Sequence, residues 1–570
     1  MQQKQSETMQ QGAQRMRRTI VSVVCSATAI FTAAGATQAA PDALEVGQEA
    51  RAVDLVAEVR DPRRDSGDRI GRHELASRDR SLTDRPDWDR PEESLYVNVF
   101  GRPLTIGGRY TMRTIYEENR LLDFDFFDTD NKDIDGDGNE SELEDTARGK
   151  SPEDDIVRLN QGLQLFLFYP FTESIAAYVS ARGSWANPLS SDVASKQDTW
   201  TIQRNESWLY GDRILGTPVG FQIGRQRIYD DREWWWDQNL DSARLHIDSE
   251  RFHFELSVAE EFAVESTDQD FIDPEEDDIF RVLGHASWIW ADRQKVGLYA
   301  LYQDDHSGDA GSIGLCIPDA PVSSPFFTAG CVDRDREDPS DATLTWFGAS
   351  ADGRLKLAGV GTLHYWLDAA GVVGKETYLD YAGDPSSRRV AAVSHSRIEG
   401  WGLNAGATWQ MRSIGRPRLT LAYAFGSGGA SSEEADVSFR QTGLEDNNGR
   451  FRGVNDFRYY GELLDPELSN LHIVTGALGF PLLRKSSIEF VYHFFRQAEA
   501  APFLRSVGFK RDPDGRHASI GHEWDVILGL EEWKHLEIEA IGAIFRAGKA
   551  FSPTENRLSY RAIAQVRFNF

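Results

Sequence analysis

The chain has 570 residues, with 62 Lys and Arg against 91 Asp and Glu, which gives a formal net charge of −29. This acidic balance argues against a nucleic-acid partner, because such a partner requires a basic surface. The mean hydropathy is −0.48, and no stretch after residue 40 approaches the ~20 consecutive apolar residues of a spanning helix. Composition therefore excludes a helical membrane protein.

Residues 1–40 have the features of a secretory signal peptide. Three arginines within 15–18 precede an uncharged apolar run at 20–36, and small residues around Ala39 offer a cleavage site. A short anchoring helix is the weaker alternative, because the run ends in AGATQAA without a basic stop signal. Translation could start at Met1 or Met16. The sequence predicts export from the cytoplasm.

Residues 41–94 are charged and almost without aromatic side chains. Such a segment cannot bury enough apolar surface to offset the entropy lost on ordering. We predict a flexible periplasmic lead-in here, followed by one large domain over residues 95–570.

An acidic loop, DIDGDGNESELE, begins at Asp133. Its oxygen-bearing side chains match the ligand positions of a calcium-binding EF-hand loop, with Gly138 at the sixth position. The predicted ligands are Asp133, Asp135, Asp137, Asn139, Ser141 and Glu144. Glu140 replaces the usual aliphatic residue and no amphipathic helix precedes the loop, so a solvated acidic loop is the alternative. We expect no required cofactor apart from this candidate Ca²⁺ site in residues 133–144.

Segments of ten to fifteen residues with alternating polarity follow, such as the apolar set at positions 163, 165 and 167. The last one, NRLSYRAIAQVRFNF, alternates up to Phe570, and a terminal Phe is the usual ending of bacterial outer-membrane barrels. We count eighteen segments between Leu104 and Phe570 and predict an all-β fold, a transmembrane antiparallel β-barrel in the outer membrane lipid. A soluble β-sandwich or propeller is the weaker alternative, since no blade repeat is visible.

Connections between the segments are unequal in length. Short ones include residues 170–173 and 352–354, whereas long polar ones lie near 119–154, 305–341, 369–396, 428–466 and 499–517. This asymmetry is typical of periplasmic turns and external loops. Within one external loop, Cys316 and Cys331 are expected to form a disulfide worth roughly 3 kcal/mol against the unfolded chain.

Two tracts, GRQRIYDDREWWWDQNLDSARL from Gly224 and FRQTGLEDNNGRFRG with GELLDPELSNL between Phe439 and Leu471, carry a family resemblance. They are similar to the alginate export porins of bacterial outer membranes. The resemblance implies a monomeric eighteen-stranded channel, not an enzyme, through which a polyanionic exopolysaccharide such as alginate leaves the cell. It also implies a periplasmic scaffold of a polysaccharide secretion complex as partner.

A pore for a polyuronate needs a series of fixed cations, preferably Arg, whose planar fork pairs with carboxylate. With the apolar parity facing lipid, the opposite parity places in the lumen Arg109, Arg113, Arg158, Arg182, Arg244, Arg561 and Arg567. Some of these arginines are expected to pair with neighbouring acids in the barrel wall. A general anion-selective diffusion porin for small solutes is the alternative function.

The resemblance adds further basic positions. Arg227 lies where the family has a pore-lining basic residue, and Arg225 precedes it, although local parity turns both outward unless Gly224 forms a bulge. Arg450, Arg452 and Arg458 resemble the basic external loop that lines the family's constriction. At Asn448, and at Asp456 or Phe457, the chain departs from the basic residues of that pattern.

The calcium loop gives the first testable prediction. Millimolar Ca²⁺ should raise the melting temperature of the purified protein, because it would order the loop between the first two strands. The substitution Asp133→Ala should abolish this gain, as measured by thermal unfolding with and without calcium. A wild-type protein whose melting temperature ignores calcium would leave the loop as a solvated acidic run.

Overall fold

A computed structural model describes residues 95–118, 155–172, 174–190, 199–212, 214–267, 272, 278–307, 342–382, 389–429, 435–509, 512–551 and 558–570. The expected signal peptide, the lead-in, the calcium loop at 133–144 and the pair Cys316 and Cys331 lie outside these residues, so they stay predictions. Among the described residues, no helix is long and apolar enough to cross a bilayer.

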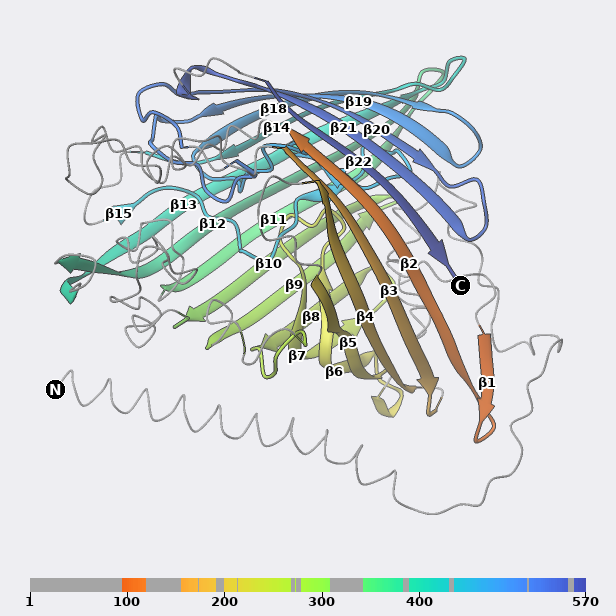
Figure 1. Ribbon diagram of the computed structural model, residues 1–570. Coiled ribbons are helices and arrows are strands. Elements are labelled where there is room, and N and C mark those ends of the chain that lie inside the picture. Colours follow the sequence, from red (N-terminus) through yellow and green to blue (C-terminus); the bar gives the residue numbers. More distant parts are fainter. Residues whose placement is uncertain are drawn as a thin grey trace, which may run out of the picture.

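Eighteen antiparallel strands of the described chain close into one barrel, as predicted (Figure 1). Each strand pairs with the next along the chain, and β22 pairs with β2 to close the ring. The barrel strands are β2 (Arg102–Glu118), β3 (Asp155–Pro170), β4 (Ile175–Ser190), β5 (Thr199–Gly211), β6 (Val219–Tyr229), β7 (Asp237–Asp248), β8 (Phe252–Ala259), β9 (Ile279–Ala291), β10 (Gln294–Asp305), β11 (Ala342–Leu357), β12 (Gly361–Ala382), β13 (Arg389–Met411), β14 (Arg418–Gly426), β18 (Leu471–Pro481), β19 (Ser486–Gln497), β20 (Ser519–Leu530), β21 (Leu536–Ala547) and β22 (Leu558–Asn569).

Smaller elements complete the described chain. They are β1 (Leu95–Val99), which pairs with the start of β2, the short strands β15 (Ala435–Asp436), β16 (Asn448–Gly449) and β17 (Phe457–Arg458), and the 3-10 turns η2 (Ile214–Gly216) and η5 (Lys549–Phe551). The last residue joins the closure as well. Phe570 exchanges two backbone hydrogen bonds with Gly108 of β2, at 2.9 and 3.0 Å.

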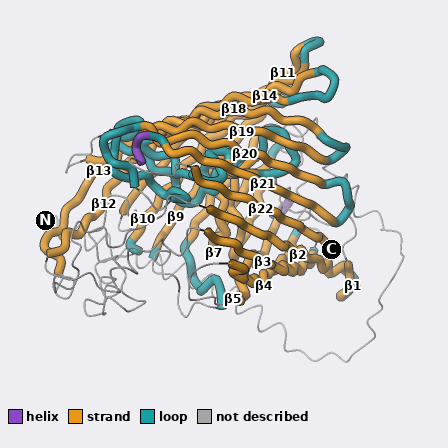
Figure 2. Tube along the Cα trace, turned by 45° about the horizontal axis from the view of Figure 1, so that its top comes forward, coloured by secondary structure: helices purple, strands orange, loops and turns teal. Residues whose placement is uncertain are grey.

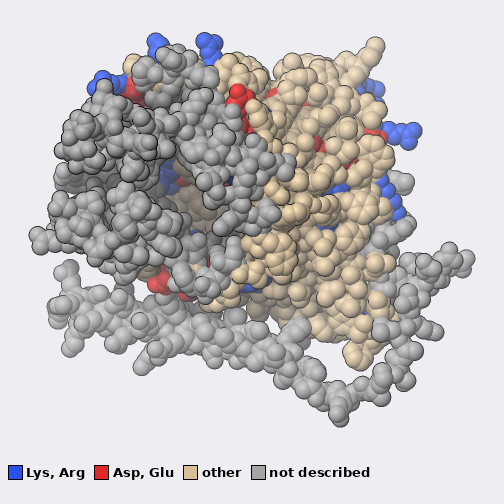
Figure 3. Space-filling model, viewed as in Figure 1, with Lys and Arg blue, Asp and Glu red and all other residues tan. Residues whose placement is uncertain are grey.

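Alternation explains why these strands form a barrel wall. On β3, Leu163, Leu165 and Leu167 are 43–49% exposed, whereas the residues between them face the interior. Strands place successive side chains on opposite faces, so one face can meet lipid and the other the lumen. Most of the described surface in Figure 3 is free of charge, as a wall in contact with lipid requires.

Two of the expected connections are wrong. Residues 369–396 were expected to form a long loop, but β12 and β13 run to Ala382 and from Arg389 with continuous pairing. Residues 352–354 were expected to be a short turn, but they lie inside β11. Both stretches contain charged residues and glycine, and a strand that carries such residues cannot be told from a loop by composition.

The connection between β14 and β18 folds into the barrel instead of standing outside it. Figure 2 shows loop segments, in teal, within the ring of strands. We call residues 435–470 the internal segment. Its Val454 nitrogen donates to Ser487 Oγ and its Asn455 side chain to the Leu528 carbonyl, both at 3.0 Å. Ser487 and Leu528 lie at the turn ends of β19 and β20. The segment therefore enters from the external side and crosses most of the lumen.

The protein's main hydrophobic core lies in this lumen. The internal segment contributes Phe439, Phe457, Tyr460 and Leu464, all at most 2% exposed, and β10, β11 and β12 contribute inward side chains. The turn between β6 and β7 contributes Trp234, Trp235 and Trp236, each 1–2% exposed. A barrel of eighteen strands is too wide to be filled by its own wall, so these inserted segments supply the packing.

One seam of the wall is irregular. β5 and β6 pair only over Ser207–Gly211 and Phe221–Arg225, because Gly224, with φ of 122°, turns β6 away from the wall. Residues 264–267 take the empty place beside β5: Arg204 N donates to the Glu265 carbonyl and Thr267 N to the Ile202 carbonyl. The hydrogen bonding of β5 therefore continues beyond the point where β6 leaves it.

The bend at Gly224 can be tested by substitution. In Gly224→Ala the new Cβ would clash with the Ser207 carbonyl, and the backbone conformation disfavours any L side chain. We expect a loss of about 1–3 kcal/mol in the free energy of unfolding, measured by urea titration of the folded barrel. Gly542→Ala is the matched control, since a Cβ at Gly542 meets nothing within 4 Å. Equal stability of the two variants would contradict this account.

Candidate functional site

A row of inward-facing arginines follows one wall of the barrel. On β2, Tyr110, Met112 and Tyr116 are exposed on the outer face, so Arg109 and Arg113 point inward. The same alternation directs Arg158 of β3 and Arg182 of β4 inward, opposite the exposed leucines of β3 and Val179 of β4. All four side chains thus point to the inner face of the wall.

Strand register sets the heights of these arginines. Arg109 lies opposite Gln164, which lies opposite Arg182, so both arginines are at one level, about 10 Å apart. Arg113 is four residues further along β2, about 13 Å toward the external end. Arg158, whose neighbour on β2 is Ile115, comes next. The four cations therefore form a ladder along the wall. The inward residues of β3 that lie between these cations are uncharged.

This wall is less covered by other parts of the protein than the wall across the barrel. Arg158 and Arg182 are exposed, although both point inward. By contrast, inward residues across the barrel are covered by the internal segment: Val372 of β12, Ile473 of β18 and Phe495 of β19 are 0–1% exposed. Neither Arg158 nor Arg182 has an ion pair among the described residues. The internal segment therefore leaves the wall at β3 and β4 uncovered, and we call this side of the lumen, along β2, β3 and β4, the passage.

The other predicted lumen arginines are paired with acids, as was expected for some of them. Arg561 of β22 lies 3.0 Å from Glu117. Arg567 lies 3.8 Å from Glu537 and 3.4 Å from Glu539. These pairs link neighbouring strands on the inner face of the wall.

Arg225 lies away from the passage. It is 4% exposed and donates to Glu261 Oε1 and Oε2 at 2.9 and 2.6 Å, with Glu265 as a further partner. The acids belong to the connection after β8, which covers the irregular seam. Arg204 joins the cluster through Glu261 at 3.0 Å. The expectation of a pathway role for Arg225 is therefore not met, because Gly224 bends the strand just before it and leaves this arginine inside the wall.

Arg227 lies beyond the bend, where β6 leans into the lumen. Its Nη2 donates to Glu233 Oε1 at 3.0 Å and to Asp237 Oδ2 at 2.8 Å. Arg244 of β7 donates to the Arg227 carbonyl at 2.9 Å and lies 3.5 Å from Glu255. The pairing of β6 with β7 continues through Gly224 without a bulge. It is the bend at Gly224 that brings Arg227 beside the acids Glu233 and Asp237.

The charges of three arginines from separate parts of the chain act on Asp446 of the internal segment. Burial and the charge of Asp237 raise the pKa of Asp446, and the charges of Arg458, Arg227 and Arg113 oppose this rise. Arg458 also pairs with Asp465. The internal segment thus meets the arginine wall at a point where cations and carboxylates are mixed.

The remaining predicted residues of the internal segment behave differently. Arg450 makes a two-pronged pair with Asp456, at 2.6 and 2.7 Å, and about half of each side chain is exposed. Arg452 adopts φ of 72° and acts electrostatically on His364 of β12. Of these three predicted residues, Arg458 is the one whose charge acts on Asp446.

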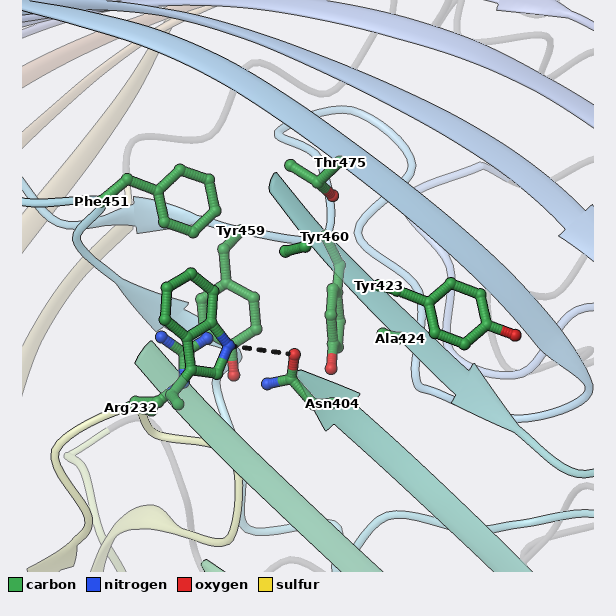
Figure 4. Close-up of a pocket in the computed structure, with 10 residues that line it drawn as sticks. Arg232, Asn404, Tyr423, Ala424, Phe451, Tyr459, Tyr460 and Thr475 are labelled. Carbon is green, nitrogen blue, oxygen red and sulfur yellow. Dashed lines mark hydrogen bonds between the residues drawn. The ribbon is translucent and has the colours of Figure 1, made fainter. Parts of the chain in front are cut away.

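The internal segment is fixed by contacts that the sequence analysis did not find. The Asn447 nitrogen donates to the Glu233 carbonyl at 3.0 Å, and Trp234 Nε1 donates to the Tyr460 hydroxyl at 2.9 Å. The Arg232 guanidinium lies between the rings of Trp366 and Tyr459, 4.4 and 4.6 Å from their centres (Figure 4). A signal was present: three consecutive tryptophans cannot all face lipid on an alternating strand.

A small cavity beside Arg232 is the pocket drawn in Figure 4, between the internal segment and β12, β13, β14 and β18. Trp366 Nε1 donates to Asn404 Oδ1 at 3.4 Å across one side, and Phe451 and Tyr460 cover others. Aromatic rings and Arg232 line most of this cavity. It therefore belongs to the packing of the internal segment and not to the passage.

The family model for alginate export matches residues 154–565. The alginate production protein AlgE of Pseudomonas aeruginosa is 25% identical over 366 residues, which cover 61% of this chain and 70% of that protein. The protein of the same name from Pseudomonas syringae pv. tomato is 25% identical over 383 residues, covering 61% and 71%.

Solved structures with a similar arrangement include the outer-membrane proteins OccK5 and OpdK of Pseudomonas aeruginosa. OccK5 has 11% sequence identity and a TM-score of 0.44, over 82% of this chain and 98% of that one. OpdK has 10% identity and the same TM-score and coverage.

The acidic turn beside Arg227 gives a pH prediction. Burial, together with the charge of Asp237, raises the pKa of Glu233 to about 9. Because this value lies above that of the unfolded chain, the native state holds the proton more tightly, and stability falls as pH rises from about 4.5 to about 9. We expect Glu233→Gln to flatten this slope, with the fluorescence of Trp234–Trp236 as a local reporter.

The control for this prediction is Asp292→Asn in a short turn, since the Asp292 side chain is 91% exposed. It should leave the slope unchanged. An identical pH dependence in wild type and Glu233→Gln would show that Glu233 does not hold the proton.

Proposed function

Because the chain belongs to the alginate export family and forms an outer-membrane β-barrel, we propose that it exports an anionic polysaccharide, alginate or a similar polyuronate. The observation that supports this most is the arginine ladder of Arg109, Arg113, Arg158 and Arg182 on the open wall of the lumen. Two of its members lack an acidic partner in the described chain. A polymer with a carboxylate on every sugar would meet cations throughout its path along this wall.

The spacing of the ladder suits movement of such a polymer. Arginine binds carboxylate through a planar fork, and the field of fixed cations is strengthened by the low-dielectric wall around a narrow passage. Carboxylates of external loops in water are screened over ~8–10 Å, so the net charge of −29 does not set the potential inside. The polymer can then pass from one cation to the next.

A polysaccharide can move through the channel only if each arginine releases it as readily as it binds it. Where the charges of Arg113, Arg227 and Arg458 act together, the protein's own Asp237 and Asp446 compete with the polymer for the same guanidinium groups. A contact of the polymer with Arg227 or Arg458 there replaces an internal ion pair, so its net gain is small. The mixed charges at this point would therefore prevent a tight complex while keeping the passage attractive to anions.

The proposal extends to partners. The internal segment leaves only the side of the lumen along the arginine ladder for a polymer. A polymer would therefore have to reach the periplasmic mouth as an extended chain. We propose that a periplasmic scaffold of a secretion complex delivers it there, and that one chain forms one pore.

The proposal is tested in planar bilayers. Under a salt gradient, the reversal potential of the wild-type channel should show preference for chloride, and soluble uronate oligomers should block the current. Arg182→Glu should weaken both effects, because it places a negative charge in the ladder without breaking an ion pair of the described chain. Arg158→Glu should act in the same direction. Arg227→Glu is a harsher test, since it leaves Glu233 and Asp237 without their cation.

Arg412→Glu is the matched control, because it makes the same charge change in an exposed turn between β13 and β14. Its selectivity and block should equal those of the wild type. A cation-selective channel that no uronate blocks would refute the export of polyanions. Anion selectivity without any uronate block would instead favour a general diffusion porin for small anions.

A further inference from the structure

Three lumen-facing side chains on β8 and β9 bring metal-ligating atoms together. His253 and Glu255 are two residues apart on β8 and share its inner face, while Phe252 and Leu256 are exposed on the outer face. His285 of β9 lies directly opposite Glu255. One ligand atom from each of the three lies within 4.8 Å of the other two, and all three side chains are half-buried.

The distances suit a small tetrahedral ion. Zinc binds imidazole nitrogen and carboxylate oxygen at about 2.0–2.2 Å, which sets neighbouring ligand atoms roughly 3.3–3.5 Å apart. His253 Nε2 and Glu255 Oε2 are 3.5 Å apart. The His285 ring supplies the third ligand, with its centre 5.7 Å from that of His253.

The surroundings hold the two imidazoles in position. Asp248 at the end of β7 contacts His253 Nδ1 at 2.5 Å. A carboxylate on this nitrogen keeps a proton there and directs Nε2 toward Glu255, where a metal can take the place of the second ring proton. Outer partners of metal-binding histidines commonly orient the ring in this way. The His285 ring stacks on Tyr299 of β10, with ring centres 4.4 Å apart. Both ligands are therefore oriented before any ion arrives.

The local charge also favours a cation. Glu255 and Asp248 contribute two negative charges, and Arg244, 3.5 Å from Glu255, contributes one positive charge. With neutral imidazoles the group carries a net charge of −1. Two nitrogen ligands and one carboxylate select zinc and similar transition ions over calcium or magnesium, which prefer oxygen ligands.

We propose that His253, Glu255 and His285 form a binding site for a divalent transition-metal ion of the zinc class, with its fourth position open to water. The ion would join β8 to β9 at the inner face, close to the short turn that precedes β8. This site is separate from the arginine ladder and from the predicted calcium loop, and it does not depend on the export proposal.

Isothermal titration of the untagged, full-length protein in detergent with zinc chloride, in millimolar calcium, tests the site. We expect one zinc ion per chain, and X-ray absorption should show two imidazole ligands. His253→Gln and His285→Gln should remove this binding. Asp248→Asn should weaken it about 10–100-fold, because it disturbs only the orientation of His253.

His364→Gln is the matched control, since His364 also faces the lumen, from β12, without belonging to the cluster. It should bind zinc like the wild type. A difference in gel migration between unheated and heated samples, equal to that of the wild type, would show that each variant still folds as a barrel. The proposal would be overturned if the wild type bound no zinc, or if the folded variants His253→Gln and His285→Gln bound zinc as tightly as the wild type.

Discussion

Backbone pairing in lipid is the constraint on which the rest of this structure depends. Hydrocarbon offers no partner to an exposed N–H or C=O group, so every strand must be paired on both sides, and the pairing of β2 with β22 closes the ring. The same need explains the irregular seam. Where Gly224 turns β6 away from β5, residues 264–267 supply the missing hydrogen bonds. The buried cluster of Arg225 with Glu261 and Glu265 then fills the junction.

Closure creates a second problem, a lumen too wide to be filled by the side chains of its own wall. The chain solves it with the internal segment and the Trp234–Trp236 turn, which pack against β10, β11 and β12. Because this packing occupies one side, water and charge are left on the other, along β2, β3 and β4. The asymmetry of the lumen therefore follows from where the hydrophobic core lies, and it gives the exposed Arg158 and Arg182 their place beside a passage.

The arginines of the lumen differ in their partners according to whether they lie next to the internal segment. Arginines next to the internal segment are held by acids, such as Arg458 by Asp465 and Arg227 by Asp237, because a cation near apolar packing needs a partner. Arg158 and Arg182 are exposed and can be hydrated, and neither has an ion pair among the described residues. One barrel thus contains mixed charges near the internal segment and hydrated cations along the wall opposite the core.

The sequence by itself determined the barrel, its eighteen strands, its family and the inward parity of Arg109, Arg113, Arg158 and Arg182, because alternation on a two-sided wall is a local property of each strand. It could not place Arg225 and Arg227, whose sides depend on a bend at Gly224, nor separate the polar ends of β12 and β13 from a loop. Only the tertiary structure decided that a loop between β14 and β18 enters the lumen and that His253, Glu255 and His285 meet. These contacts join residues distant along the chain, and their geometry exists only once the ring has closed.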